Sequence, residues 1–364
     1  MFRAGMGMFT RAVGGSCALL AGLAVCVMAT SVATPSTAQA ATLASVQLTS
    51  GKPVKAVIST PGQQITYTFS AKAHKHVTFQ VTQFNMSNGT SGGAFTLNFY
   101  EPGSTSSYTS HYFPDNGYFD FTTPLAGTWK VQLVPDGASV GTLTLTFAKD
   151  VATVALASGA PVNTRIKFEG QHAGYTFAAT ANQHYTFQVT QFNMSNGTSG
   201  GAFTLNFYKP GSTSPYTSHY FPDNGYFDFT TPLTGTWKVQ LVPDGASVGT
   251  MTLTFAKDVA TVALASGTPV ATTINFEGQH AGYTFTSTAG ATRTFNVTQF
   301  NFTNGSSGGA FTLNFYEPGS TSSYTSHYFP GNGSFSFTTP LSGTWSVQLV
   351  PDGASVGSMT LTRT

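Results

Sequence analysis

Cysteine is almost absent: Cys17 and Cys26 are the only two in the 364-residue chain, and both lie within the first 40 residues. The rest of the chain can form no disulfide, thiolate metal site or cysteine nucleophile. If the protein is exported, each domain must therefore be held together by its hydrophobic core alone. A domain of roughly 100 residues buries about 65% of the surface that its unfolded chain exposes, which makes this feasible.

Charge is also scarce, since Asp, Glu, Lys and Arg make up only 8% of the chain. Once Arg3 and Arg11 are set aside, basic and acidic residues are equal in number, and no run of lysine or arginine occurs. A nucleic-acid ligand needs a basic stripe that neutralises phosphates. No stretch after residue 40 approaches the roughly 18 apolar residues of a transmembrane helix. We therefore expect neither a nucleic-acid partner nor a transmembrane segment in the mature chain.

The first 40 residues have the pattern of a secretory signal peptide. Arg3 and Arg11 are followed by the uncharged, apolar stretch 12–29 and by a small-x-small cleavage site at 38–40. The pattern predicts a secreted protein. Leu-Ala-Val-Cys at 23–26 weakly resembles a bacterial lipobox. Anchoring through a lipid on Cys26 is therefore the alternative.

Helical periodicity is missing, and period-2 alternation takes its place. Trp129, Val131 and Leu133 alternate with polar residues, which is typical of a half-buried strand. Pro-Asp-Gly at 135–137 then predicts a turn. A second alternation over 143–147 completes a predicted hairpin.

This hairpin recurs with Trp237 and Trp345, each 108 residues after the preceding tryptophan. The predicted organisation is a signal peptide, 1–40, and three repeats, 41–150, 151–258 and 259–364. Each repeat has about eight short strand signals separated by turns, which predicts an all-β fold of three tandem β-sandwich or jelly-roll domains. The joints contain no glycine- or proline-rich spacer, so we expect limited freedom between repeats.

The first two repeats differ at only four positions between 79–150 and 187–258. Their agreement therefore says little about function, and the more divergent third repeat is the useful comparison.

Three motifs of the second repeat carry a resemblance. They are Gly-Tyr-Thr-Phe at 174–177, Leu-Asn-Phe-Tyr-Lys-Pro-Gly at 205–211 and Pro-Leu-Thr-Gly-Thr-Trp-Lys-Val at 232–239. In these motifs the repeat resembles the bacterial pre-peptidase C-terminal domain, a β-sandwich appended to secreted enzymes and surface proteins. Members usually accompany a catalytic domain, and we identify none in this chain. The resemblance therefore implies a fold and no activity.

Aromatic residues cluster after the middle of each repeat, in a segment, 104–116 in the first, that we interpret as a long loop or edge segment. Tyrosines presented there can stack on sugar rings or anchor a protein interface. The candidate ligand-binding residues are Tyr108, Tyr112, Tyr118, Tyr216, Tyr220, Tyr226, Tyr324 and Tyr328. The alternative is that these tyrosines cover the end of the core, which is the role that we expect of the neighbouring phenylalanines.

Acidic residues next to this cluster could hold Ca²⁺, which prefers oxygen ligands from loops. The weak candidates are Asp115, Asp120, Asp223 and Asp228. Their spacing matches no complete calcium loop, and an Asx-type turn is the alternative. The third repeat has Gly331 and Ser336 in place of both acids, so no metal site is common to the three repeats.

Catalytic constellations are not evident. The same carboxylates make a poor glycosidase pair. Ser110 and His111 are adjacent on an extended segment, where neighbouring side chains point apart, and no orienting acid is evident. We therefore expect no catalytic residue, no cofactor and no enzyme activity.

These observations favour a secreted, monomeric repeat protein that binds a repeating extracellular ligand, a polysaccharide or a cell-surface protein. Three repeats would raise avidity without any single site being tight. The alternatives are a structural spacer or adhesin stalk, and an accessory protein to a separate secreted enzyme.

Overall fold

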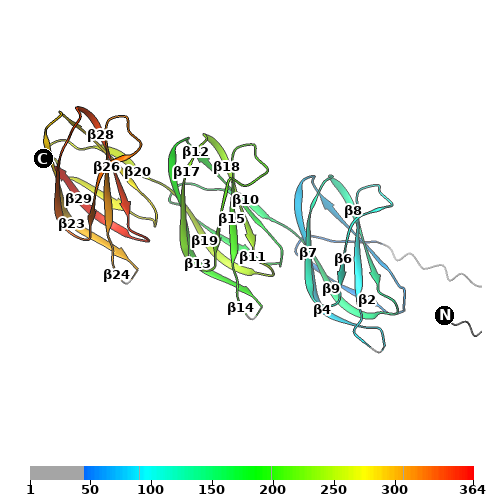
Figure 1. Cartoon of the computed structure of the whole chain (residues 1–364). Helices are drawn as coiled ribbons and strands as arrows, with labels where there is room; N and C mark the ends of the chain where they lie inside the picture. Colours follow the sequence, from blue (N-terminus) through cyan, green and yellow to red (C-terminus); the bar gives the residue numbers. More distant parts are fainter. Residues whose placement is uncertain (1–44, 90, 198, 306) are drawn as a thin grey trace, which may run out of the picture. The chain divides into compact units, whose positions relative to one another are not determined.

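The computed structural model describes residues 45–89, 91–197, 199–305 and 307–364. The predicted signal peptide, with Cys26, lies outside these residues. The described part of the chain is all-β and contains three β-sandwich repeats, each built from two sheets (Figure 1). No helix in it is long and apolar enough to cross a membrane.

The first repeat pairs a five-stranded sheet with a four-stranded one. In spatial order, the five-stranded sheet consists of β1 (Val46–Gln47), β3 (Ile65–Ala71), β8 (Gly127–Pro135), β5 (Phe95–Tyr100) and β6 (Ser107–Phe113). The four-stranded sheet consists of β2 (Pro53–Ile58), β9 (Val140–Lys149), β4 (Lys75–Ser87) and β7 (Gly117–Thr123).

The second repeat has the same strand arrangement with one short strand, β14, added to its second sheet. Its first sheet consists of β10 (Val151–Ala155), β12 (Ala173–Ala179), β18 (Gly235–Pro243), β15 (Phe203–Tyr208) and β16 (Thr217–Phe221). Its second sheet consists of β11 (Pro161–Ile166), β19 (Val248–Lys257), β13 (Gln183–Asn196) and β14 (Ser199–Gly200), with β17 (Gly225–Thr231) paired to β13.

The third repeat follows the second strand for strand. Its first sheet consists of β20 (Val259–Ala263), β22 (Ala281–Ser287), β28 (Gly343–Pro351), β25 (Phe311–Tyr316) and β26 (Ser323–Phe329). Its second sheet consists of β21 (Val270–Ile274), β29 (Val356–Arg363), β23 (Thr292–Asn304) and β24 (Ser307–Gly308), with β27 (Gly333–Thr338) paired to β23. The predicted fold class, three tandem β-sandwich or jelly-roll domains, is confirmed.

The core of each repeat lies between its two sheets and contains a cluster of aromatic rings. Trp129 is 0% exposed, and its indole Nε1 donates a hydrogen bond to the Leu125 carbonyl at 3.1 Å. Its ring stacks on Phe69, which in turn packs against Phe79 and Phe147 from the opposite sheet. The alternation that predicted the strand at Trp129 thus places its apolar side inside, as Trp237 and Trp345 show in the other repeats.

The segment 104–116, predicted as a long loop or edge segment, contains the edge strand β6. Thr109, His111 and Phe113 point toward the core, and Ser110 and Tyr112 point outward. The strand pairs with β5 through Thr96 opposite Tyr112 and Asn98 opposite Ser110. Position 112 is therefore held on a sheet rather than on a mobile loop.

Candidate functional site

The outer surface of the five-stranded sheet carries a group of polar and aromatic side chains that we call the aromatic face. In the first repeat it consists of Tyr112 and Ser110 on β6, Asn98 and Tyr100 on β5, and Gln132 on β8. The Tyr100 hydroxyl donates a hydrogen bond to Gln132 Oε1 at 2.9 Å, which fixes both side chains. Tyr112 is 52% exposed, and within the described ranges its hydroxyl makes no hydrogen bond of this kind.

The same five side chains recur in the other repeats. The second aromatic face consists of Tyr220, Ser218, Asn206, Tyr208 and Gln240, and the third of Tyr328, Ser326, Asn314, Tyr316 and Gln348. Tyr220 and Tyr328 are 51% and 50% exposed, and the tyrosine–glutamine hydrogen bond is kept in both. A sheet surface with an exposed ring beside amide and hydroxyl groups can stack on a sugar and bond its hydroxyls.

Tyr108 is placed differently from Tyr112, although it lies on the same strand. A bulge between Phe99 and Tyr100 leaves Tyr108 unpaired in the ladder. Its ring meets Trp129 edge-on, with centroids 5.6 Å apart, while 47% of the residue stays exposed. Tyr216 and Tyr324 repeat this contact. These three tyrosines therefore cover the edge of the core and do not belong to the aromatic face.

Tyr118 and Tyr226 lie on the other sheet, away from the aromatic face. Tyr118 projects from β7 against Gly170 of the second repeat, where a Cβ would overlap its ring. The equivalent Tyr226 packs on Gly278, and its hydroxyl donates a hydrogen bond to the Gly353 carbonyl at 3.0 Å. Both tyrosines are thus contacts between successive repeats.

The Tyr118 contact belongs to the interface between repeats one and two, which we call the first joint; the Tyr226 contacts belong to the equivalent interface between repeats two and three, the second joint. The loop 167–172 of the second repeat packs against β4 and β7, and Thr78 donates a hydrogen bond to the Glu169 carbonyl at 2.8 Å. Gln171 Nε2 donates to the Lys149 carbonyl at 2.7 Å. The second joint repeats both bonds, from Thr186 to the Glu277 carbonyl and from Gln279 to the Lys257 carbonyl.

A cluster of titratable groups lies at the centre of each joint. In the first joint, His76 Nδ1 is 2.8 Å from Asp150 Oδ1, and His76 Nε2 is 3.4 Å from Asp120 Oδ1. The ring of His172 stacks on His76 with centroids 3.7 Å apart. The second joint cluster consists of His184, Asp228, Asp258 and His280 in the same arrangement.

The two stacked histidines have opposite pKa shifts. Burial disfavours the charged form of His76, but its contacts with the Asp120 and Asp150 carboxylates outweigh this effect and raise its pKa to about 9. Burial, followed by repulsion from His76, lowers the pKa of His172 to about 4. His172 is therefore neutral at pH 7, and its Nδ1 accepts a hydrogen bond from Gln240 Nε2 at 3.1 Å. The stack pairs an imidazolium with a neutral imidazole.

His76, Asp150 and His172 place potential metal ligands close together, which raises the question whether the cluster could bind a metal ion. A histidine binds a metal in the plane of its ring, at about 2.0–2.1 Å. The planes of His76 and His172 are only 11° from parallel, so they do not converge on one ion. His76 also has a carboxylate at each nitrogen. This geometry suits a protonated bridge between two carboxylates and does not fit a metal ion.

The calcium candidates do not come together either. Asp120 and Asp228 face the joint histidines, whereas Asp115 and Asp223 lie in exposed turns. Among the described residues, no group with converging metal ligands includes Asp115 or Asp223. Asn116, between the two acids in the sequence, accepts a hydrogen bond from the Phe84 amide at 3.0 Å, which ties this segment to the strand β4.

Ser110 and His111 point to opposite sides of β6. Ser110 is exposed on the aromatic face, whereas His111 turns inward and stacks on Phe119 at 4.7 Å. Burial lowers its pKa. The two side chains cannot act as a nucleophile and its base from this arrangement.

The joints were missed by sequence reasoning, although the sequence contained a signal. Phe-Glu-Gly-Gln-His occurs at 168–172 and 276–280, but the first repeat has Thr-Pro-Gly-Gln-Gln at 60–64. Conversely, the third repeat has Thr292 and Ser336 where the first two have joint histidines and aspartates. A motif that two repeats share and the third lacks, at positions where one repeat meets the next, indicates an interface between repeats.

Comparison with known proteins adds little. No family model and no curated protein matches the chain. A periplasmic inhibitor of g-type lysozyme from Aeromonas hydrophila aligns over 30% of this chain and 98% of its own, at 17% identity and a TM-score of 0.23. The CUB1-EGF-CUB2 domains of rat MASP-1 align over 58% of this chain and 100% of their own, at 8% identity and a TM-score of 0.20. A triple jelly-roll protein of an archaeal virus aligns over 84% of this chain and 82% of its own, at 15% identity and a TM-score of 0.16. Similarities this distant carry no argument about function.

Proposed function

We propose that the protein is a secreted, non-catalytic binding array whose aromatic faces contact a repeating extracellular glycan. The observation that carries this proposal is the recurrence of five outward side chains, with Tyr112, Tyr220 and Tyr328 about half exposed in each repeat. An exposed tyrosine on a rigid strand loses little conformational entropy on binding. We also propose that each repeat is a divergent pre-peptidase C-terminal domain.

The spacer or adhesin-stalk role is the second candidate, and the joints favour it. Buried joint clusters and backbone contacts between repeats would hold a binding face at a distance from its anchor. The two roles are compatible, because a rigid spacing of three faces also determines which ligand repeats can be engaged together.

The test is a pull-down of the full-length mature protein with insoluble polysaccharides and whole cells. Retention by at least one glycan should be lost in the variant Tyr112→Ala/Tyr220→Ala/Tyr328→Ala. The matched control is Leu125→Ala/Leu233→Ala/Leu341→Ala, which removes three equally exposed side chains away from the aromatic faces. Equal retention of wild type and tyrosine variant would reject the aromatic faces and leave the spacer role.

A further inference from the structure

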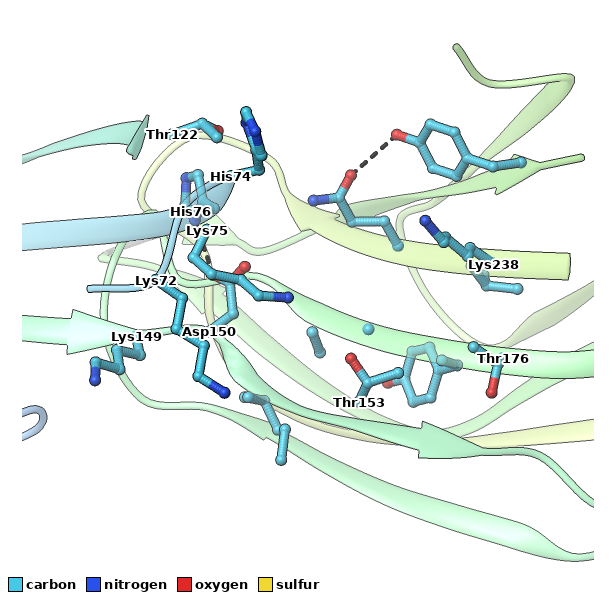
Figure 2. Close-up of a pocket in the computed structure, with 18 of the residues that line it drawn as sticks. Lys72, His74, Lys75, His76, Thr122, Lys149, Asp150, Thr153, Thr176 and Lys238 are labelled. Carbon is cyan, nitrogen blue, oxygen red and sulfur yellow. Dashed lines mark hydrogen bonds and ion pairs between the residues drawn. The ribbon is translucent and has the colours of Figure 1, made fainter. Parts of the chain in front are cut away.

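A groove of about 680 Å³ lies at the first joint (Figure 2). One wall comes from the turn before β4 and from Lys149 and Asp150, and the other from strands β12, β15 and β18 of the second repeat. Tyr208 and Gln240, two members of the second aromatic face, line this groove. The groove is therefore continuous with the surface that we propose to bind a glycan.

The groove is strongly basic in a chain that has few charges. Four exposed lysines line it, namely Lys72, Lys75, Lys149 and Lys238. Figure 2 shows the first three near Asp150, and Lys238 on a strand of the second repeat. Asp150 is the one acidic residue of the lining, and it already contacts His76 and the His172 amide. A cleft lined by one sign of charge concentrates ions of the opposite sign.

The second joint provides an internal comparison, because it has the same contacts without this charge. The positions of Lys72, Lys75 and Lys238 are occupied there by Thr180, Gln183 and Ser346, and only Lys257 remains. The histidine stack and the two hydrogen bonds made by the glutamine side chain and the histidine backbone amide are nevertheless the same in both joints. The three extra lysines are therefore not needed to hold two repeats together.

We propose that the groove at the first joint binds the acidic groups of an anionic glycan. The hydroxyl groups of Thr153 and Thr176 line the same groove and suit the sugar hydroxyls, while the lysines meet carboxylate or sulfate. The glycan part of this inference rests on the proposed function, whereas the preference for an anion rests on the groove alone. An acidic unit in the groove would leave neighbouring units on the second aromatic face.

The test exchanges the three lysines for the residues of the second joint, as Lys72→Thr/Lys75→Gln/Lys238→Ser in the full-length mature protein. The probes are oligogalacturonate, the same oligomer with its carboxyls reduced to alcohols, a sulfated dextran oligosaccharide and a single-stranded oligonucleotide. Binding of the acidic oligosaccharides should fall roughly tenfold, with binding of the reduced oligomer unchanged. The reciprocal variant Thr180→Lys/Gln183→Lys/Ser346→Lys should bind more acidic oligomer than wild type, and salt should weaken this binding. Carboxylated and sulfated probes distinguish the two sources of negative charge.

Acidic-probe affinity unchanged by the lysine exchange would overturn the proposal, as would tighter binding of the oligonucleotide than of either acidic glycan. Tyr220→Ala separates this failure from that of the proposed function. If Tyr220→Ala weakens binding of every oligosaccharide and the lysine exchange weakens none, the aromatic face stands and the basic groove does not. The opposite pattern would support the groove and reject the face.

Discussion

Each repeat depends on one tryptophan that no disulfide can replace. Trp129, Trp237 and Trp345 are each 0% exposed and donate their indole hydrogen bond to a leucine carbonyl four residues earlier. Removing such a side chain leaves a large cavity and an unpaired carbonyl.

Trp129→Ala should therefore destabilise the first repeat by about 3–5 kcal/mol. In urea denaturation of the full-length protein followed by circular dichroism, part of the transition should move to lower urea. Trp129→Phe, which keeps most of the volume, is the control and should cost less. A curve that Trp129→Ala leaves unchanged would contradict the core position of this residue.

The joint histidines combine burial with close carboxylates, and these two causes shift their pKa values in opposite directions. His76 and His184 are each bridged by two carboxylates, which raises their pKa values to about 9. His172 and His280 are buried against them, and burial lowers their pKa values to about 4. All four have an ordinary value of 6.5 in an exposed state.

These shifts predict that the joints are most stable near pH 6.5. The stabilisation from the raised pKa of His76 and His184 is complete below 6.5 and is lost as the pH rises through about 9. The stabilisation from the lowered pKa of His172 and His280 is present above 6.5 and is lost as the pH falls through about 4. Calorimetry of the full-length protein between pH 4 and 9 should show falling stability on both sides.

Two variants taken from the chain itself separate the contributions. His76→Thr/His184→Thr introduces the threonine that the third repeat has at the equivalent position, 292. This variant should remove the alkaline loss of stability. His172→Gln/His280→Gln introduces the glutamine that the first repeat has at the equivalent position, 64. This variant should reduce the loss of stability at acid pH. Identical pH profiles in wild type and both variants would show that the clusters do not stabilise the joints.

At the scale of strands, one bulge determines the course of the longest strand in each repeat. The β4–β9 ladder breaks between Thr82 and Asn85, where Gln83 adopts a φ of 51° and accepts a hydrogen bond from Thr144 at 2.8 Å. Gly141 pairs with Met86, next to this bulge, with a φ of 141°, and a Cβ there would overlap the Asn85 carbonyl oxygen. The glycine is required both by its backbone conformation and by this close approach.

Gly141→Ala should consequently destabilise the first repeat by about 1–3 kcal/mol, because the β4 backbone must shift or the bulge must open. Thermal unfolding of the full-length protein would measure this effect. Gly103→Ala is a useful comparison, because this glycine also has a positive φ, 79°, but a Cβ there meets open space. Similar losses in the two variants would mean that backbone strain alone, and not the contact with Asn85, makes Gly141 necessary.

Alternation predicted the strands well wherever one face is apolar. The strands at Trp129 and Phe95 could be assigned because every second residue is large and buried. The edge strand β6 was ambiguous, because its inward residues include Thr109 and His111 and its outward ones include Tyr112. Sequence reasoning named Tyr112, but it could not separate it from Tyr108 and Tyr118. That separation depends on a ladder bulge and on which sheet carries each residue.

The joints could not be derived from one repeat, because each joint combines residues from two. His76 and His172 are 96 positions apart in the sequence, and no local pattern connects them. The loss of Asp120 and Tyr118 at Ser336 and Ser334 could be read as a site that decayed in the third repeat. The structure shows instead that Tyr118 and Asp120 lie at the joint with the next repeat, against Gly170 and His76.

At the scale of the molecule, the proposed function depends on three equivalent faces that contact one repeating ligand. Linked sites raise the apparent affinity without new contacts, provided that the ligand can span them. Binding should therefore depend on how many faces are intact, and less on which one is removed.

The most direct measurement is the retention of the full-length mature protein on the best glycan from the pull-down, compared among tyrosine variants. The series consists of Tyr220→Ala alone, Tyr112→Ala/Tyr220→Ala and Tyr112→Ala/Tyr220→Ala/Tyr328→Ala. The account predicts that apparent affinity falls on the order of tenfold with each tyrosine lost. Retention that stays at the wild-type level in the triple variant, with its circular dichroism spectrum unchanged, would contradict it.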